Sequence, residues 1–127
     1  MPIGLGSTFL NREAQNLPSH LWVVISKPDS SGQVAIANLT SCRGTDDDCG
    51  CFCDRGDHPF VHHKSYVNYA CIKVVTLAKL NELLKKDLIE LHADASDDFL
   101  DRIWEGSTRS RFTRNEIIDL LRSQDLI

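Results

Sequence analysis

The densest group of chemically reactive side chains in this sequence lies between Asn38 and Tyr69. Within that segment stand hydroxyl, imidazole, carboxylate, guanidinium and ammonium groups: Thr40, Ser41, Arg43, Asp57, His58, His62, His63 and Lys64. Side chains of these types, carried on the loops of a rigid scaffold, can transfer protons and stabilise the negative charge of a phosphate. The sequence therefore predicts a site for general acid–base chemistry on a phosphate-containing substrate.

Metal-free RNA cleavage is a reaction that these groups could carry out. The ribose 2′-hydroxyl attacks the adjacent phosphate, so a base must accept its proton, an acid must protonate the leaving 5′-oxygen, and donors or cations must stabilise the phosphorane. His58 is the first candidate for the acid or base, because an imidazole titrates near neutral pH and the adjacent Asp57 could tune or orient a neighbouring group. Arg43 is the candidate phosphate ligand, since its planar guanidinium can bind two phosphate oxygens at once.

Two alternatives accompany this assignment. In a site built differently, His62, His63 or Lys64 could serve instead. Adjacent side chains on a strand point to opposite faces, so there His62 and His63 could not both face one groove. Asp57 and His58 could also do no more than hydrogen-bond their own loop, and the pair at residues 40–41 could simply end a strand.

The five cysteines suggest a different chemistry. Cys49, Cys51 and Cys53 alternate, so on a strand their thiols would share one face, and Cys42, Cys71 or a histidine could complete a zinc site. The spacing is not that of the usual zinc-binding cysteine pairs. We therefore favour thiols that pack the core and expect no metal cofactor, with zinc bound by these cysteines as the alternative.

A second group of basic side chains lies near the C-terminus, where Arg109 and Arg111 stand beside Phe112. Together with Arg55 and Lys64, these arginines are predicted to bind the backbone of a nucleic acid. The alternative is an ordinary exposed loop, in which the arginines pair with nearby acids: Asp97, Asp98, Asp101 and Glu105.

Short strands must position the residues of the first group. Apolar runs bounded by turn residues predict strands at 21–25, 34–39, 65–69 and 72–75, with a hairpin loop at 27–32 between the first two. Several short antiparallel strands in so small a chain must close, or nearly close, to protect their edges. We therefore expect a small, strongly twisted barrel over residues 18–76.

After residue 76 the apolar pattern takes the period of helices. A leucine stripe predicts a helix from residue 77, Ser96 as N-cap and Gly106 as stop predict a second, and Thr113 with Glu116 predicts a capping box that begins a third. The predicted fold is α+β: a small antiparallel SH3-like barrel (18–76) followed by three helices (77–127), in a single domain spanning residues 1–127.

The composition excludes several classes of protein. The chain has 127 residues, of which 42% are hydrophobic, so it can form one globular domain with a core. Eighteen acidic side chains outnumber 14 basic ones, which excludes a strongly cationic nucleic-acid coat protein. No apolar run approaches the roughly 20 residues that a membrane span needs, and no basic residue precedes the short apolar stretch at the N-terminus. We therefore expect a soluble cytoplasmic protein that does not act at a membrane.

Three segments between residues 20 and 76 form a pattern: HLWVVIS at 20–26, NLTS at 38–41, and GDHPF at 56–60 leading to SYV at 65–67. This pattern resembles that of the MazF/PemK-type toxins. The resemblance implies an SH3-like barrel, usually in a dimer, and a metal-independent endoribonuclease of a bacterial toxin–antitoxin pair. The partners that it implies are single-stranded RNA, an antitoxin protein and a second copy of the chain.

The resemblance also implies roles for individual residues. Thr40 and Ser41 match the strand-end Thr-Ser of the family, which approaches the scissile phosphate, and they would donate hydrogen bonds there rather than act as nucleophiles. His20 stands just before the first predicted strand, near a position where family members often place an active-site residue. The competing class of function is a non-catalytic module that keeps the barrel and binds RNA or a protein, with zinc bound to its cysteines as one variant.

Overall fold

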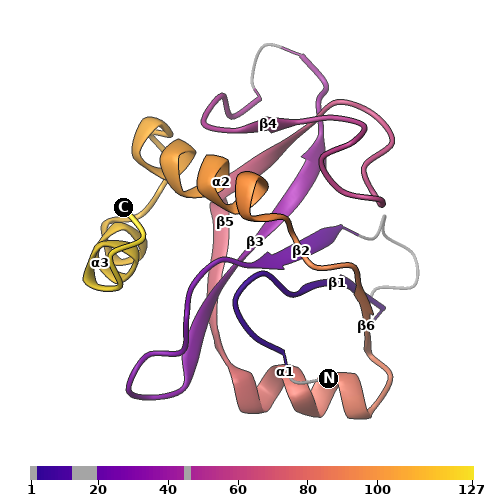
Figure 1. The fold of residues 1–127 in the computed structure, drawn as a ribbon, viewed down its shortest axis with the longest axis vertical. Coiled ribbons are helices and arrows are strands. Elements are labelled where there is room, and N and C mark those ends of the chain that lie inside the picture. The colour runs from indigo at the N-terminus through magenta and orange to yellow at the C-terminus, as the bar shows by residue number, and fades with distance from the viewer. Residues whose placement is uncertain (1–2, 13–19, 45–46) are drawn as a thin grey trace.

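The computed structural model describes residues 3–12, 20–44 and 47–127 and has an α+β fold (Figure 1). It consists of one antiparallel sheet and three helices, in the order β1 (Thr8–Asn11), β2 (Leu21–Val24), β3 (Gln33–Ser41), β4 (Phe52–Cys53), β5 (Ser65–Thr76), α1 (Leu77–Lys85), β6 (Ile89–His92), α2 (Asp97–Arg109) and α3 (Asn115–Ser123). The predicted fold class is confirmed.

The six strands form a single curled sheet in the order β4-β5-β3-β2-β1-β6. Its longest pairing joins β3 to β5, from Gln33 opposite Thr76 to Ser41 opposite Ser65, with an irregularity between Ile36 and Asn38. Among the described residues β4 and β6 pair with one neighbour each, so the curled sheet is a half-barrel whose two edge strands do not pair with each other.

The sequence did not predict three of the strands. These are β1, β4 and β6, which have four, two and four residues. The conformation of such short runs depends on pairing with distant segments, and unlike β2, which is also short, none of them is an uninterrupted apolar run of four residues. Because β1 and β6 lie outside residues 18–76, the sheet extends beyond the predicted barrel. The segments predicted at 65–69 and 72–75 form one continuous strand, β5, which pairs with β3 along most of its length.

The three predicted helices are present, with two local corrections. Ser96 caps α2 as predicted, accepting a hydrogen bond from the backbone N–H of Phe99 at 3.1 Å. Gly106 does not stop that helix, which continues to Arg109. The predicted capping box is also wrong, because the N-cap of α3 is Arg114, whose side chain makes no capping bond.

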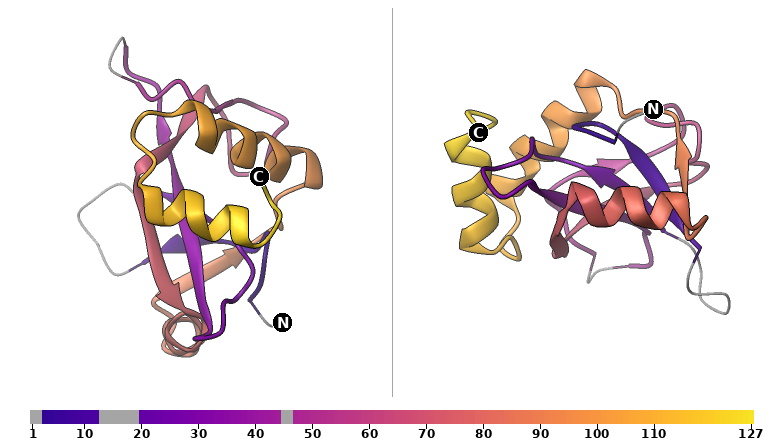
Figure 2. Two further views of the ribbon diagram at one scale, coloured as in Figure 1. Left: turned by 90° about the vertical axis from the view of Figure 1, so that its left-hand side faces the viewer. Right: turned by 90° about the horizontal axis from the view of Figure 1, so that it is seen from below.

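Alternate side chains of the strands belong to two hydrophobic cores, one on each face of the sheet. Leu21 and Val23 of β2 belong to the core shared with α2 and α3, whereas Trp22 and Val24 belong to the core shared with α1 and β6. Figure 2 shows α2 and α3 packed side by side, with α1 at a distance from both. The ends of β3 and β5, where the reactive residues gather, are therefore anchored by buried side chains.

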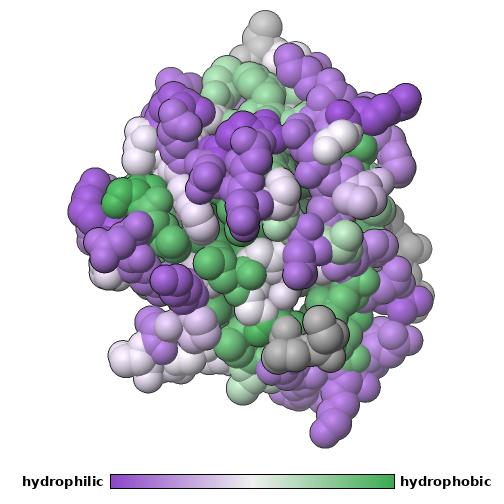
Figure 3. Space-filling model, in the orientation of Figure 1, coloured by the Kyte–Doolittle hydropathy of each residue, from purple (hydrophilic) through white to green (hydrophobic). Residues whose placement is uncertain are grey.

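The surface of the described residues is largely polar. The large hydrophobic side chains that it exposes are Phe52, Val74 and Phe112. On the face drawn in Figure 3, hydrophobic atoms form several separate clusters among hydrophilic ones. None of the described helices has the length and apolar composition that crossing a membrane requires.

Candidate active site

A cleft of about 310 Å³ opens where β3 ends, between the start of β2 and the loop that precedes β5. We call it the β3-end cleft. Its polar lining consists of three imidazoles, three hydroxyl groups and a guanidinium group: His20, Thr40, Ser41, Arg43, His62, His63 and Ser65. Leu21, Leu39, Phe60 and Val61 supply an apolar wall. Its volume lies at the lower end of the range of roughly 300–1,000 Å³ that small-molecule sites occupy.

A hydrogen bond between Ser41 and His63 crosses the cleft. Ser41 Oγ lies 2.6 Å from His63 Nε2, and Ser41 is opposite Ser65 in the pairing of β3 with β5. The Ser65 hydroxyl donates to the backbone carbonyl of His63 at 3.1 Å, so the backbone and the ring of His63 are both held. This imidazole is therefore fixed in place although it lies in a loop.

Among the described residues, one hydrogen bond holds the ring of His20. Its Nδ1 lies 3.0 Å from the carbonyl oxygen of Leu39, which can only accept. Nδ1 must therefore carry the proton in the neutral ring, and Nε2 is left as a hydrogen-bond acceptor. A ring in this tautomer is suited to accept a proton.

Arg43 supplies the positive charge of the cleft. Its side chain makes no ion pair with any described residue, and its backbone N–H donates to the Asp47 carboxylate at 2.9 Å. Asp47 also accepts from the N–H of Gly44 at 3.1 Å. The turn that carries Arg43 is thus fixed through its backbone, and within the described part of the chain no carboxylate neutralises the guanidinium.

The structure does not bring His58 into the cleft. His58 is buried, with 3% of its surface exposed, and both ring nitrogens have partners. Nδ1 accepts from the N–H of Phe60 at 3.0 Å, so Nε2 carries the proton and donates to the carbonyl of Ala93 at 2.6 Å, with Thr8 Oγ1 at 3.2 Å. The ring therefore ties the β4–β5 loop to β1 and to the residue after β6, across the open side of the half-barrel.

Asp57 has a structural contact as well. Its carboxylate forms an ion pair with Arg102 of α2 and accepts from the N–H of Asp54 at 2.7 Å. Asp57 and His58 together hold the β4–β5 loop. This arrangement corresponds to the alternative in which the two residues only organise their loop.

His62 and His63 both line the cleft, contrary to the prediction that only one could face a groove. That prediction applied strand geometry, but both residues lie in the loop before β5, where side chains do not alternate. The sequence named His63 only as an alternative, because its contact with Ser41 depends on the pairing of Ser65 with Ser41, which is visible only in the structure.

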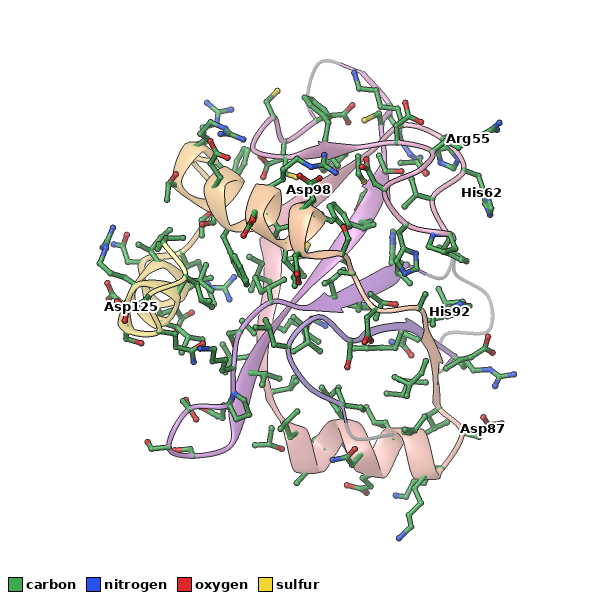
Figure 4. All side chains as sticks on the ribbon, in the orientation of Figure 1. Arg55, His62, Asp87, His92, Asp98 and Asp125 are labelled. Carbon is green, nitrogen blue, oxygen red and sulfur yellow. The ribbon has the colours of Figure 1, made fainter. Side chains whose placement is uncertain are left out.

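The four predicted phosphate-binding side chains do not form one surface. Lys64 lies over the ring of Phe52, with its ammonium 4.6 Å from the ring centroid. Arg55 comes from the β4–β5 loop, as His62 does (Figure 4), and donates to the His62 carbonyl at 3.4 Å. Arg109 and Arg111 line a separate, open hollow beside Phe112 that also contains acids, Asp47 and Asp48. There Arg109 pairs with Glu105 at 3.2 Å.

The cysteines do not converge on a metal position. Cys51 and Cys53 are buried, whereas Cys49 is exposed. Burial raises the pKa of the Cys53 thiol to about 12 and that of Cys51 in the same direction, so both thiols are neutral. In the described part of the chain no group of three histidine, cysteine, aspartate or glutamate side chains is arranged to hold a metal ion.

Comparison of the chain with models of known protein families, with curated proteins and with solved structures found no match. The resemblance to MazF/PemK-type toxins therefore stays a prediction from the sequence pattern. The site must be interpreted from its own geometry.

Proposed function

We propose that this protein is a metal-independent endoribonuclease that cleaves single-stranded RNA in the β3-end cleft. The observation that carries the proposal is the convergence in one cleft of two fixed imidazoles, His20 and His63, with the guanidinium of Arg43, which has no ion-pair partner among the described residues. A base, an acid and a cation around one phosphate are what this reaction requires. The resemblance to MazF/PemK-type toxins implies the same reaction.

The proposed roles follow from the tautomers. His20 Nε2 accepts the proton of the 2′-hydroxyl, whose oxygen attacks the phosphorus. Protonated His63 gives a proton to the departing 5′-oxygen from Nδ1, while its Nε2–H donates to Ser41. Arg43 and the Thr40 hydroxyl stabilise the negative charge of the phosphorane. The products are a 2′,3′-cyclic phosphate and a 5′-hydroxyl, and no water or cofactor is consumed.

The same resemblance supports partners and a compartment as part of this proposal. An enzyme of this class would act on cytoplasmic RNA, as a homodimer, and would be held inactive by an antitoxin protein. These statements rest on the resemblance alone.

The test is incubation of the purified protein with a mixed pool of single-stranded RNA, with and without EDTA, followed by mapping of the ends. We expect EDTA-resistant cuts that end in a 2′,3′-cyclic phosphate, and a loss of about 100- to 10,000-fold in rate in His20→Ala and in His63→Ala. His92→Gln is the control, because His92 lies on β6, outside the β3-end cleft.

Intact RNA after incubation with folded protein would contradict the proposal and favour the non-catalytic binding module. A melting temperature that falls in EDTA would in that case support the zinc-stabilised variant of the module.

A further inference from the structure

Phe52, which is exposed, and Tyr66, which is half-buried, lie side by side on the outer face of the sheet near the end of β3. Phe52 of β4 is directly opposite Tyr66 of β5, and Tyr66 is opposite Thr40 of β3, so the three side chains form a row on one face of the sheet. Cys51 and Cys53, the neighbours of Phe52, are buried, which places the Phe52 ring on the other face, where 37% of its surface is exposed. Thr40 also lines the cleft, but it alternates with Leu39 and Ser41, so the row lies on the sheet face opposite the Ser41 hydroxyl and meets the cleft only at the end of β3.

The row carries a positive charge. Lys64 precedes Tyr66 by two residues, and its ammonium lies 4.6 Å from the centroid of the Phe52 ring. Among the described residues Lys64 has no ion-pair partner. Asp47 is an acid near Tyr66, and it accepts two backbone hydrogen bonds from the turn at Arg43. Burial, with the charge of Asp47, raises the pKa of Tyr66, so its phenol ring stays neutral.

We infer that Phe52, Tyr66 and Lys64 form a base-stacking platform for an unpaired nucleotide of an RNA strand that passes from the cleft around the end of β3 to this outer face. The inference rests on the proposed function, whose substrate class it makes more specific: an unpaired nucleotide with an accessible base. Aromatic rings on the face of a sheet stack unpaired bases without regard to sequence, and a cation beside them binds the backbone phosphate. A base-paired strand could not present its base face to these rings, so the platform selects single-stranded RNA.

Binding to a labelled 2′-O-methyl RNA octamer of mixed sequence tests this inference by fluorescence anisotropy. The octamer has no free 2′-hydroxyl, so it binds without being cleaved. We expect Phe52→Ala to weaken binding about 5- to 100-fold and Phe52→Tyr, which keeps the ring, to bind like the parent protein. We also expect Lys64→Gln to reduce the slope of log K against log salt concentration by about 0.7.

Phe112→Ala is the matched control. Phe112 is also an exposed phenylalanine under a cation, with Arg111 at 4.9 Å from its ring centroid, but it lies in the separate arginine hollow. We expect this variant to bind the octamer normally. Melting temperatures close to that of the parent protein would show that the variants are folded.

The outcomes separate this inference from the proposed function. If Phe52→Ala weakens octamer binding but the parent protein cuts no RNA, the platform stands and the proposed ribonuclease activity is wrong. If the protein cleaves RNA but Phe52→Ala binds the octamer as tightly as the parent protein, or Phe112→Ala alone weakens binding, the platform is wrong and the proposed ribonuclease activity stands. Absence of octamer binding by the parent protein would overturn the platform outright.

Discussion

Ser41 Oγ and His63 Nε2 lie 2.6 Å apart, although 22 positions separate the two residues in the sequence. The pairing of β3 with β5 sets this distance, because Ser41 ends one strand and His63 stands just before the other. With Nε2 bonded to the hydroxyl, the opposite ring nitrogen, Nδ1, can face a substrate. Ser41 is therefore a positioning residue for the proposed acid.

Removal of this hydroxyl should lower turnover with little effect on substrate binding. In Ser41→Ala we expect kcat to fall about tenfold, since one hydrogen bond to the ring contributes roughly 1–1.5 kcal/mol, while KM stays close to that of the parent protein. Ser41→Thr keeps the hydroxyl and should recover most of the rate. Steady-state kinetics on a single-stranded RNA substrate measure both constants, and a tenfold rise in KM at unchanged kcat would contradict the positioning role.

Gly106 lies inside α2, at the position predicted to end the helix, and packs closely against the backbone of Gly50. A methyl group at this position would overlap with the carbonyl oxygen of Gly50 and the hydroxyl of Tyr69. Glycine to alanine inside a helix normally stabilises by about 1 kcal/mol, but here we expect Gly106→Ala to lower the free energy of unfolding by about 2 kcal/mol or more. Gly4→Ala is the control in urea denaturation, because nothing lies within 4 Å of the added carbon. A Gly106→Ala variant more stable than the parent protein would refute the close packing.

His58 should prove essential for stability rather than for chemistry. Removal of its buried ring in His58→Ala leaves Phe60 N–H without its acceptor and creates a cavity, so we expect a loss of about 2–4 kcal/mol in the free energy of unfolding. Urea denaturation measures the loss, and cleavage assays below the unfolding midpoint measure activity. A His58→Ala variant as stable as the parent protein but without activity would contradict this structural role and support a catalytic one.

Because two thiols are buried, we expect the folded protein to lose stability at alkaline pH. The pKa of Cys53 is raised to about 12 by burial, and burial also raises the pKa of Tyr69, whose hydroxyl donates to the Ile103 carbonyl at 2.7 Å. Because the folded pKa of Cys53 exceeds that of an unfolded thiol, near 8.5, its contribution is complete below about pH 8 and is lost as the pH rises toward 12.

We expect the free energy of unfolding, measured in urea, to fall above about pH 9 by up to about 1.4 kcal/mol per pH unit for each buried thiol. Cys53→Ala should flatten this dependence. A free energy that stays constant between pH 8 and pH 10.5 would contradict the burial of these groups.

The long elements could be predicted from the sequence because their patterns persist over enough residues. Strand β3 and the helix that Ser96 caps were found in this way. The four-residue strands β1 and β6 could not be found, since each depends on pairing with a segment far along the chain. Gly106 has the residue type of a helix stop, and only the position of Gly50 in space shows that it serves close packing instead.

The residues of the candidate site also differ in how far the sequence could identify their roles. Thr40, Ser41, Arg43 and His20 were named from the sequence, and they share one cleft because β2 and β3 are paired neighbours. His58 was named on its residue type, but its burial is set by contacts with Thr8 and Ala93, 50 and 35 positions away. Local sequence carries no information on such contacts.

The chemistry of the ends that this protein leaves on a single-stranded RNA in the presence of EDTA decides whether it is a metal-independent ribonuclease. We expect a 2′,3′-cyclic phosphate at each cut, loss of cutting in His63→Ala, and loss of any one cut when the nucleotide before it lacks its 2′-hydroxyl. RNA that remains intact, or a cut that persists at a 2′-deoxy position, would contradict the proposed activity.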